Sequence, residues 1–205
     1  MFRLVTFREK NDTWVLDDLK PGFIEFGRLF KIKMALVGRI FATRSPWRLI
    51  RSYRTRRALH KAKNILVVCF GNIYRSPLAE RYLKKVLPQS VTINSAGYLP
   101  RSGRRCHQRA IDIAAELDID LDDHLSQIIT PEMADQADII LTFDKENQQT
   151  LKNMFSSAGG KIFPIGLLSF TGPIYFDDPV ESNLYTLRNG YRGIKAAIDS
   201  FAKSY

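Results

Sequence analysis

Cysteine is scarce in this chain: Cys69 and Cys106 are the only two among 205 residues. Two thiols at unrelated positions give no framework of disulfide bonds, which favours a protein of a reducing compartment such as the cytoplasm. The sequence also has no run of 18 apolar residues, because Arg39 interrupts the best stretch. A membrane-spanning helix is therefore not expected. The first residues lack the pattern of a signal peptide, and we expect a cytoplasmic protein.

Acidic residues are sparse in one part of the chain. Residues 1–63 contain 16 lysines and arginines against 5 acidic residues, whereas residues 64–205 contain 15 against 16. The positive net charge of +10 therefore belongs to the N-terminal part. We predict a basic N-terminal extension at 1–62 and a nearly neutral domain at 63–205. The second part is long enough to bury a core of its own.

Strand-like and helix-like segments alternate after residue 63. Apolar runs predict four strands, at 64–69, 91–95, 138–143 and 161–165. Helical patterns follow them at about 77–87, 107–117, 144–155 and 181–203. Thr130-Pro131 adds the cap and first-turn proline of a further short helix. This alternation predicts an α/β fold with a parallel four-stranded sheet flanked by helices, whose ligand lies beyond the carboxyl ends of the strands.

The first predicted strand ends in the segment that carries the chemistry. Five residues separate Cys69 from Arg75, and Pro77 then opens a helix. A loop of this kind turns successive backbone N–H groups toward one point at a helix N-terminus, which suits an oxyanion of phosphate size. The spacing lets the thiol lie beneath a bound phosphorus while the arginine grips two oxygens as a fork. We predict a phosphate-binding loop made of Phe70, Gly71, Asn72, Ile73, Tyr74, Arg75 and Ser76.

Cys69 is the candidate nucleophile of this loop. A helix N-terminus and an arginine both stabilise the thiolate form of a cysteine, which attacks without a separate base. Ser76 can donate its hydroxyl to the sulfur, and Asn72 can hold the shape of the loop because asparagine tolerates left-handed conformations. The alternative is that Cys69 is a small buried apolar residue. The joint pattern of strand, Cys, Gly-Asn, Arg-Ser-Pro and helix disfavours it.

The segment from Cys69 to Glu80 resembles the signature of the low-molecular-weight protein tyrosine phosphatases. The likeness continues through 94–97, 137–144 and Asp178-Pro179, and covers about residues 63–205. It is greatest to bacterial members, including those encoded with polysaccharide-export machinery. The resemblance implies hydrolysis of phosphotyrosine in proteins through a cysteinyl-phosphate, with no metal or cofactor, and a role in polysaccharide export or in the control of a tyrosine kinase. It also implies that Asp178 is the general acid.

Asp178 suits that role on chemical grounds as well. Attack on an aryl phosphate expels a phenolate, which needs a proton from a carboxylic acid, and the carboxylate can afterwards activate water. Pro179 restricts Asp178 to an extended backbone and stiffens the loop that presents it. The neighbouring Asp177 is the competing candidate, and we interpret it as a solvated loop charge.

The rim of the predicted pocket departs from the family pattern. Residues 180–182 read Val-Glu-Ser, where the family usually has aromatic residues after the Asp-Pro pair. Tyr98 and Leu99 are therefore the candidates to line the substrate pocket. Ile73 occupies a position that the family associates with tyrosine specificity, whereas a threonine there resembles the arginine phosphatases.

Two other functions use a similar loop. A thiol-dependent arsenate reductase needs additional cysteines to relay a disulfide and typically has glutamine in place of Pro77. Here Tyr74 stands where mammalian-type phosphatases carry a second cysteine, which excludes a protective vicinal disulfide, and we interpret Cys106 as an unreactive thiol. A non-catalytic phosphoprotein-binding module would lose the nucleophile or the acid, and this chain has both.

The extension has no counterpart in the family and is interpreted from its own pattern. Residues 2–7 and 13–16 predict a hairpin around Asn11-Asp12. Residues 23–41 predict a helix with a broad apolar face, and Ser45-Pro46 opens a second, arginine-rich helix to about His60. Residues 23–60 suit an anionic membrane surface at the inner face or a homodimer, and the apolar face of 23–41 suits packing on the domain. Nucleic acid is the least supported partner, because no fold signature accompanies the arginines.

Overall fold

The computed structural model describes residues 8–10, 13–15 and 45–204, and the chain divides into two compact units, 1–43 and 44–205. In the first unit, β1 (Arg8–Lys10) pairs antiparallel with β2 (Thr13–Val15). The two strands flank positions 11 and 12, where the hairpin turn is predicted. Residues 2–7 of that prediction and the helix predicted at 23–41 lie outside the described residues.

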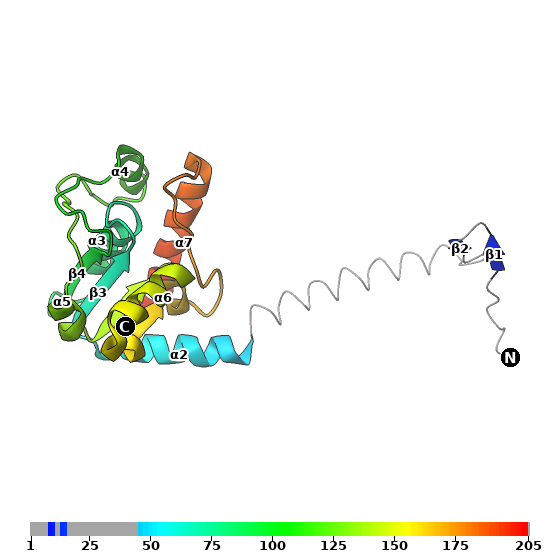
Figure 1. Cartoon of the computed structure of the whole chain (residues 1–205), viewed down its shortest axis with the longest axis horizontal. Coiled ribbons are helices and arrows are strands. Elements are labelled where there is room, and N and C mark those ends of the chain that lie inside the picture. The colour runs from blue at the N-terminus through cyan, green and yellow to red at the C-terminus, as the bar shows by residue number, and fades with distance from the viewer. Residues whose placement is uncertain (1–7, 11–12, 16–44, 205) are drawn as a thin grey trace. The chain divides into compact units, whose positions relative to one another are not determined.

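The second unit is built on a parallel sheet of four strands in the order β4-β3-β5-β6 (Figure 1). The strands are β3 (Asn64–Cys69), β4 (Thr92–Gly97), β5 (Ile139–Thr142) and β6 (Ile162–Pro164). In register, Val67 of β3 lies between Ser95 of β4 and Leu141 of β5. The predicted α/β class is confirmed. Because strands are added on opposite sides of β3, its carboxyl end lies at a switch point, where such sheets bind ligands.

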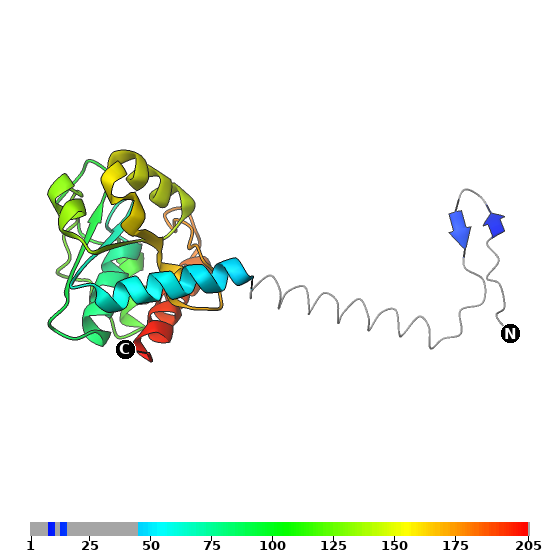
Figure 2. The same cartoon turned by 90° about the horizontal axis from the view of Figure 1, so that it is seen from below.

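Helices cover both faces of the sheet (Figures 1 and 2). One face carries α3 (Arg75–Val86), α4 (Gln108–Ala115) and α7 (Leu184–Ala202). The other carries α5 (Pro131–Gln136) and α6 (Lys145–Met154). Two 3₁₀ turns, η1 (Ser156–Lys161) and η2 (Ile165–Leu168), flank β6. Thr130 caps α5 as the sequence predicts, because its hydroxyl accepts from the backbone N–H of Met133 at 3.3 Å. Ser45, the other predicted cap, stands at the N-cap position of α2 but its side chain makes no capping bond.

Strand β3 is buried on both faces, which explains its unbroken apolar run. Ile65, Val67 and Cys69 enter the core shared with α3, α4 and α7. Leu66 and Val68 enter the second core, on the side of α5 and α6. Because side chains alternate along a strand, Cys69 ends β3 on the face that α3 covers.

The second unit begins at Arg44 and so includes α2 (Pro46–Lys61), which the sequence analysis placed in the extension. Its start at Ser45-Pro46 is as predicted. Arg48 Nε donates to the carbonyl of Phe170 at 3.0 Å, and Arg56 Nη1 donates to the carbonyl of Ser200 at 3.1 Å. Leu59 is buried in the core. Figure 2 shows α2 crossing the near side of this unit.

No helix in the described ranges is both long and apolar enough to cross a membrane.

Candidate active site

The loop between β3 and α3 is held by the side chain of Asn72, which has a φ of +52°. Asparagine tolerates this left-handed conformation better than most residues. Its amide nitrogen donates to the hydroxyls of Ser76 and Ser95, both at 2.9 Å, and its oxygen accepts from the backbone N–H of Gln127 at 2.9 Å. The geometry is consistent with the structural role predicted for Asn72.

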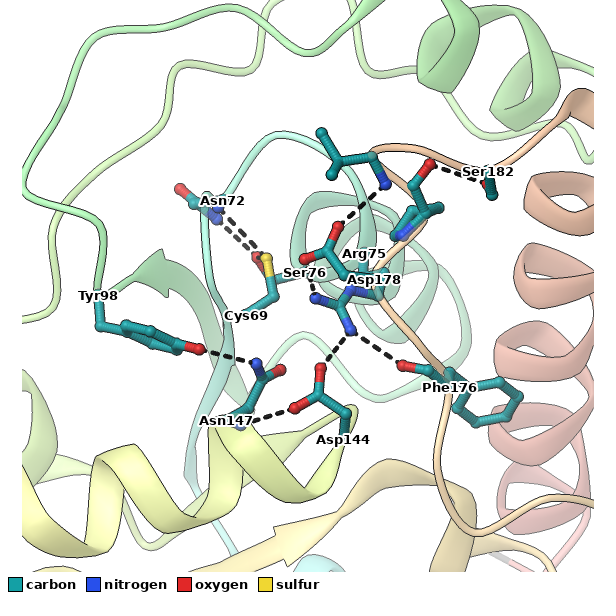
Figure 3. A network of polar contacts seen from close by, with 12 residues as sticks. Cys69, Asn72, Arg75, Ser76, Tyr98, Asp144, Asn147, Phe176, Asp178 and Ser182 are labelled. Carbon is teal, nitrogen blue, oxygen red and sulfur yellow. Dashed lines mark hydrogen bonds and ion pairs between the residues drawn. The ribbon is translucent and has the colours of Figure 1, made fainter.

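The sulfur of Cys69 lies at the base of this loop (Figure 3). Its Sγ atom is 3.0 Å from the Ser76 hydroxyl and accepts from the backbone N–H of Asn72 at 3.2 Å. The backbone N–H donates to the sulfur, and the Ser76 hydroxyl is placed so that it can donate to it as well. Hydrogen bonds to a charged acceptor are stronger than those to a neutral one. The sulfur thus lies where two donors can stabilise a negative charge on it.

Arg75 begins α3, and its guanidinium is only 2% exposed. Nη1 donates to Asp144 Oδ2 at 2.6 Å and to the carbonyl of Phe176 at 2.9 Å, while Nη2 donates to Asp178 (Figure 3). Nε is buried and finds no acceptor within the described part of the chain. The Nη1 side is therefore fixed, and the Nε and Nη2 edge is the one that can take two oxygens of an anion.

The charges around Arg75 outweigh its burial. Burial alone would lower the pKa of this guanidinium, but its electrostatic interactions with Cys69, Asp178 and Asp144, with the hydrogen bond to Asp144, together raise it. The arginine is thus a permanent cation at the base of the site.

Asp144 is a site residue to which the sequence analysis gave no role. It stands directly after β5, and one oxygen caps α6 by accepting from the backbone N–H of Asn147 at 2.6 Å. The other oxygen holds Arg75. The available signal was its position: in a parallel sheet, the carboxyl end of β5 lies at the same edge as that of β3.

Asp178 lies on the loop before α7, and its side chain is 39% exposed. One carboxylate oxygen accepts from Arg75 and the other from the backbone N–H of Val180 at 3.1 Å. The loop is tied to α4 where Arg109 donates to the carbonyl of Ser182. Asp177 is exposed and lines a cavity between this loop and α7, which Arg75 and Asp178 line as well. Of the two carboxylates, Asp178 alone also lines the cavity over Cys69.

A cavity of about 220 Å³ lies over Cys69, and ten residues line it. They are Cys69, Phe70, Gly71, Ile73, Tyr74, Arg75, Leu99, Arg104, Asp178 and Val180. The structure thus brings together the predicted nucleophile, arginine and acid, while Asn72 and Ser76 are buried and do not line the cavity. The cavity is open on the side where Phe70 and Val180 are exposed.

The two residues proposed for the pocket wall differ in position. Leu99 lines the cavity. Tyr98 does not; its ring packs edge-to-face on Phe70, with 5.3 Å between ring centroids, and its hydroxyl accepts from Asn147 at 3.1 Å. Arg104 is a lining residue that the sequence analysis missed, and its Nη2 donates to the carbonyl of Gly71 at 2.5 Å. The cluster of arginines at 101–109 was the signal for it.

Gly97, at the end of β4, packs directly against the backbone of the phosphate-binding loop. A Cβ atom at Gly97 would lie 2.7 Å from the carbonyl oxygen of Phe70 and 2.9 Å from the nitrogen of Asn72. Only glycine allows the end of β4 to approach the loop backbone this closely.

Two buried titratable groups lie near the loop. Burial raises the pKa of Cys106 to about 12, so this thiol is protonated at neutral pH. Burial also lowers the pKa of His124, whose Nε2 lies 3.0 Å from the carbonyl oxygen of Asn72. A neutral ring that faces a carbonyl must donate its Nε2–H, so His124 supports the loop from behind.

Comparisons with known proteins agree with this geometry. Residues 64–204 match the family model described as "Low molecular weight phosphotyrosine protein phosphatase". The probable low molecular weight protein-tyrosine-phosphatase EpsP of Ralstonia nicotianae is 32% identical over 141 residues, which cover 68% of this chain and 93% of EpsP.

Solved structures show the same fold. Wzb of Vibrio vulnificus in complex with benzylphosphonate is 32% identical, with a TM-score of 0.63, over 70% of this chain and 99% of Wzb. The YwlE arginine phosphatase from Geobacillus stearothermophilus is 28% identical, with a TM-score of 0.63, over 69% of this chain and 92% of YwlE. From the family model, the relatives and the fold, it follows that this chain belongs to the low molecular weight protein-tyrosine-phosphatase family of phosphoric monoester hydrolases.

Proposed function

We propose that this enzyme hydrolyses phosphotyrosine in proteins through a cysteinyl-phosphate intermediate. Cys69 is the nucleophile, Arg75 holds the phosphoryl group, and Asp178 is the general acid. One observation carries the proposal: Cys69, Arg75 and Asp178 line the same cavity, with the Nε and Nη2 edge of the arginine available to an anion.

Binding and transfer follow from these contacts. Two phosphate oxygens take the Nε and Nη2 edge of Arg75 and displace the carboxylate of Asp178. The freed carboxylate takes up a proton from solvent and stays in the cavity wall as a carboxylic acid. The sulfur of Cys69 forms a bond to phosphorus while the bond from phosphorus to the phenolic oxygen breaks. Asp178 gives its proton to that oxygen, so tyrosine leaves as a neutral phenol.

The second step returns the enzyme to its first state. Water attacks phosphorus and gives a proton to the carboxylate of Asp178, and the phosphorus–sulfur bond breaks. The electrons of that bond stay on Cys69 as a thiolate, beside the hydroxyl of Ser76 at 3.0 Å. The products are tyrosine and inorganic phosphate.

The cavity wall supports an aromatic substrate. Phe70, Ile73, Leu99 and Val180 give it an apolar side suited to a phenyl ring. A phosphorylated arginine would bring a guanidinium toward Arg104, which also lines the cavity, and like charges repel. The relative Wzb of Vibrio vulnificus is solved with benzylphosphonate, which likewise joins an aromatic ring to a phosphorus acid group.

The chain resembles bacterial family members that are encoded with polysaccharide-export machinery. We propose that its physiological substrate is a tyrosine-phosphorylated protein of such machinery, for example the kinase. An Asp178→Ala protein should retain such a phosphoprotein long enough for isolation, because the nucleophile and Arg75 remain. Cys69→Ser should show no turnover, and a covalent phosphate label should form only in proteins that keep Cys69.

The test of the acid compares leaving groups. Asp178→Asn should slow hydrolysis of alkylphenyl phosphates by about 10²- to 10⁴-fold. It should slow nitrophenyl phosphate much less, because nitrophenolate departs without a proton. Rates across a series of aryl phosphates measure this, with Asp177→Asn as the matched control. An equal slowing of all substrates, or a larger effect at Asp177, would remove Asp178 from the role.

A further inference from the structure

Helix α2 is fastened to the phosphatase domain along one side. Its buried residues, Arg48, Ser52, Thr55 and Leu59, recur every three or four positions and so share one face. Ser52 donates to the carbonyl of Ser169 at 3.3 Å, next to the contact of Arg48 with Phe170. The opposite side of the helix is therefore held in a fixed orientation toward solvent.

The exposed surface of α2, which extends from this opposite side to the flank at Arg51, combines aromatic, aliphatic and cationic residues. We define the outer face of α2 as Trp47, Ile50, Arg51, Tyr53, Arg54 and Arg57, all of them exposed. The exposed fractions are 73% for Trp47, 60% for Tyr53 and 50% for Ile50, which are large for such side chains. The sequence from 45 to 63 has seven lysines and arginines and no acidic residue.

This combination matches the chemistry of an anionic bilayer surface. Tryptophan and tyrosine favour the headgroup region, where one end of the ring is apolar and the other wet. Arginine binds lipid phosphates as a bidentate fork, and Ile50 adds apolar area that can enter the acyl boundary. Residues 23–44, which lead into α2, are also rich in apolar side chains and carry five basic residues against one acidic.

A homodimer through the same face is disfavoured by symmetry. In a two-fold dimer the same patch meets itself, so the two sets of Arg51, Arg54 and Arg57 would be brought together in one interface. No carboxylate lies on α2 to neutralise them. A surface of phosphate groups supplies the missing negative charge, whereas a second copy of this face adds positive charge.

We propose that the outer face of α2 binds anionic membrane surfaces, with Trp47, Ile50 and Tyr53 in the headgroup region and Arg51, Arg54 and Arg57 on lipid phosphates. This inference goes beyond the proposed hydrolysis and does not depend on it. The membrane is contacted by a helix that lies on its surface, not by a segment that crosses it.

The first experiment uses the fluorescence of the full-length protein. The chain has two tryptophans, Trp14 and Trp47, so a Trp14→Phe protein reports on Trp47 alone. Vesicles rich in phosphatidylserine should shift its emission to the blue, and brominated acyl chains should quench it. Phosphatidylcholine vesicles should do neither. An emission spectrum that does not respond to anionic vesicles at low salt overturns the proposal.

The second experiment separates charge on the outer face from charge in general. The triple variant Arg51→Gln/Arg54→Gln/Arg57→Gln should bind anionic vesicles about a hundredfold more weakly at low salt, since each basic side chain near such a surface contributes roughly a fivefold factor. Lys85→Gln/Lys145→Gln/Arg192→Gln removes three exposed charges elsewhere in the domain and is the matched control.

Three outcomes count against the outer face. If both triple variants lose equal affinity, net charge alone drives binding. If the Arg51→Gln/Arg54→Gln/Arg57→Gln protein binds as well as the parent protein, the membrane contact lies outside the outer face of α2. If sedimentation shows that the parent protein is a dimer and this triple variant a monomer, the face is an interface between copies.

Discussion

The catalytic end of the domain and the α2 end use arginine in opposite ways. At the catalytic end, Arg75 is hydrogen-bonded to two carboxylates, and its electrostatic interactions with Cys69 and with these carboxylates raise its pKa. At the α2 end, Arg48 and Arg56 donate to backbone carbonyls and to one serine hydroxyl, and burial lowers the pKa of both. The first arrangement leaves a strong positive charge, whereas the second uses the donors to close a packing contact.

The acceptor that binds the arginine determines whether the contact can be opened. A carboxylate bonded to arginine can be exchanged for another anion, so the contact between Arg75 and Asp178 can open to admit phosphate. A carbonyl at the end of a 3₁₀ turn or a helix cannot be exchanged, because it is part of the backbone. Arg56 also stacks over the rings of Phe170 and Phe201, at 4.8 and 5.6 Å from their centroids.

Replacing the arginine of the catalytic end should have the largest effect. Arg75→Lys conserves the charge but loses the fork, and we expect kcat/KM to fall by about 10²- to 10³-fold or more, the usual cost of losing one positioned donor to a developing anion. Steady-state rates on an aryl phosphate measure this.

The matched control for that prediction is Arg109→Lys, in which another arginine near the site keeps its charge. A near-normal rate in Arg75→Lys would show that the charge alone suffices. The catalytic arginine would then differ from those of α2 in where its charge lies, and not in its bidentate binding of an anion.

Replacing an arginine of the α2 end should lower the stability of the domain and leave the rate of hydrolysis unchanged. Arg56→Ala removes the bonds to the carbonyls of Leu168 and Ser200, and we expect a loss of roughly 1.5–3 kcal/mol in the free energy of unfolding. Denaturant unfolding measures it. The rate on an aryl phosphate should not change.

The neighbouring Arg57→Ala is the control, since Arg57 is exposed. It should leave stability within about 0.5 kcal/mol of the parent. A fall in activity with Arg56→Ala would mean that the two ends are coupled, contrary to the separation described above.

The smallest effect concerns His124, on the catalytic side. Its pKa in the folded protein lies below the unfolded value of 6.5, so its contribution to stability is complete above that pH. The contribution is lost as pH falls through the interval between the two values, because only the unfolded chain gains the proton there. The free energy of unfolding, measured between pH 8 and pH 5, should fall by less than about 1.4 kcal/mol per pH unit from this group.

His124→Gln keeps a donor for the carbonyl of Asn72 and should remove this part of the pH dependence. An unchanged slope in that variant would assign the acid sensitivity to other groups.

Features formed by contiguous residues could be predicted from the sequence, whereas contacts between distant segments could not. The sheet and its helices followed from apolar runs and caps, such as the strand 64–69 and the Thr130 cap. The loop from Cys69 to Ser76 was predictable because its residues are contiguous. Asp144 and Arg104 received no role, since their contacts with Arg75 and Gly71 join segments far apart in the chain.

The docking of α2 was not foreseen: packing on the domain was one alternative for the apolar face of residues 23–41, and not for the arginine-rich helix. Its arginines bond to carbonyls of residues 168–170 and 200, and a carbonyl is present at every position of a sequence. The pattern of residue types in the sequence therefore cannot predict which carbonyls these arginines contact. The three exposed arginines of the same helix look no different in sequence from Arg48, which is buried, and Arg56, which is half-buried.

Strand β3 acts as a spacer between the two ends. It begins just after α2 and ends at Cys69, and its six residues span about 20 Å. If the outer face of α2 rests on a bilayer, the cavity stands at a height set largely by this strand. An enzyme fixed in this way searches in two dimensions and has a preferred reach: phosphotyrosines on flexible tails near the membrane come within range at high effective concentration, and those far from it do not.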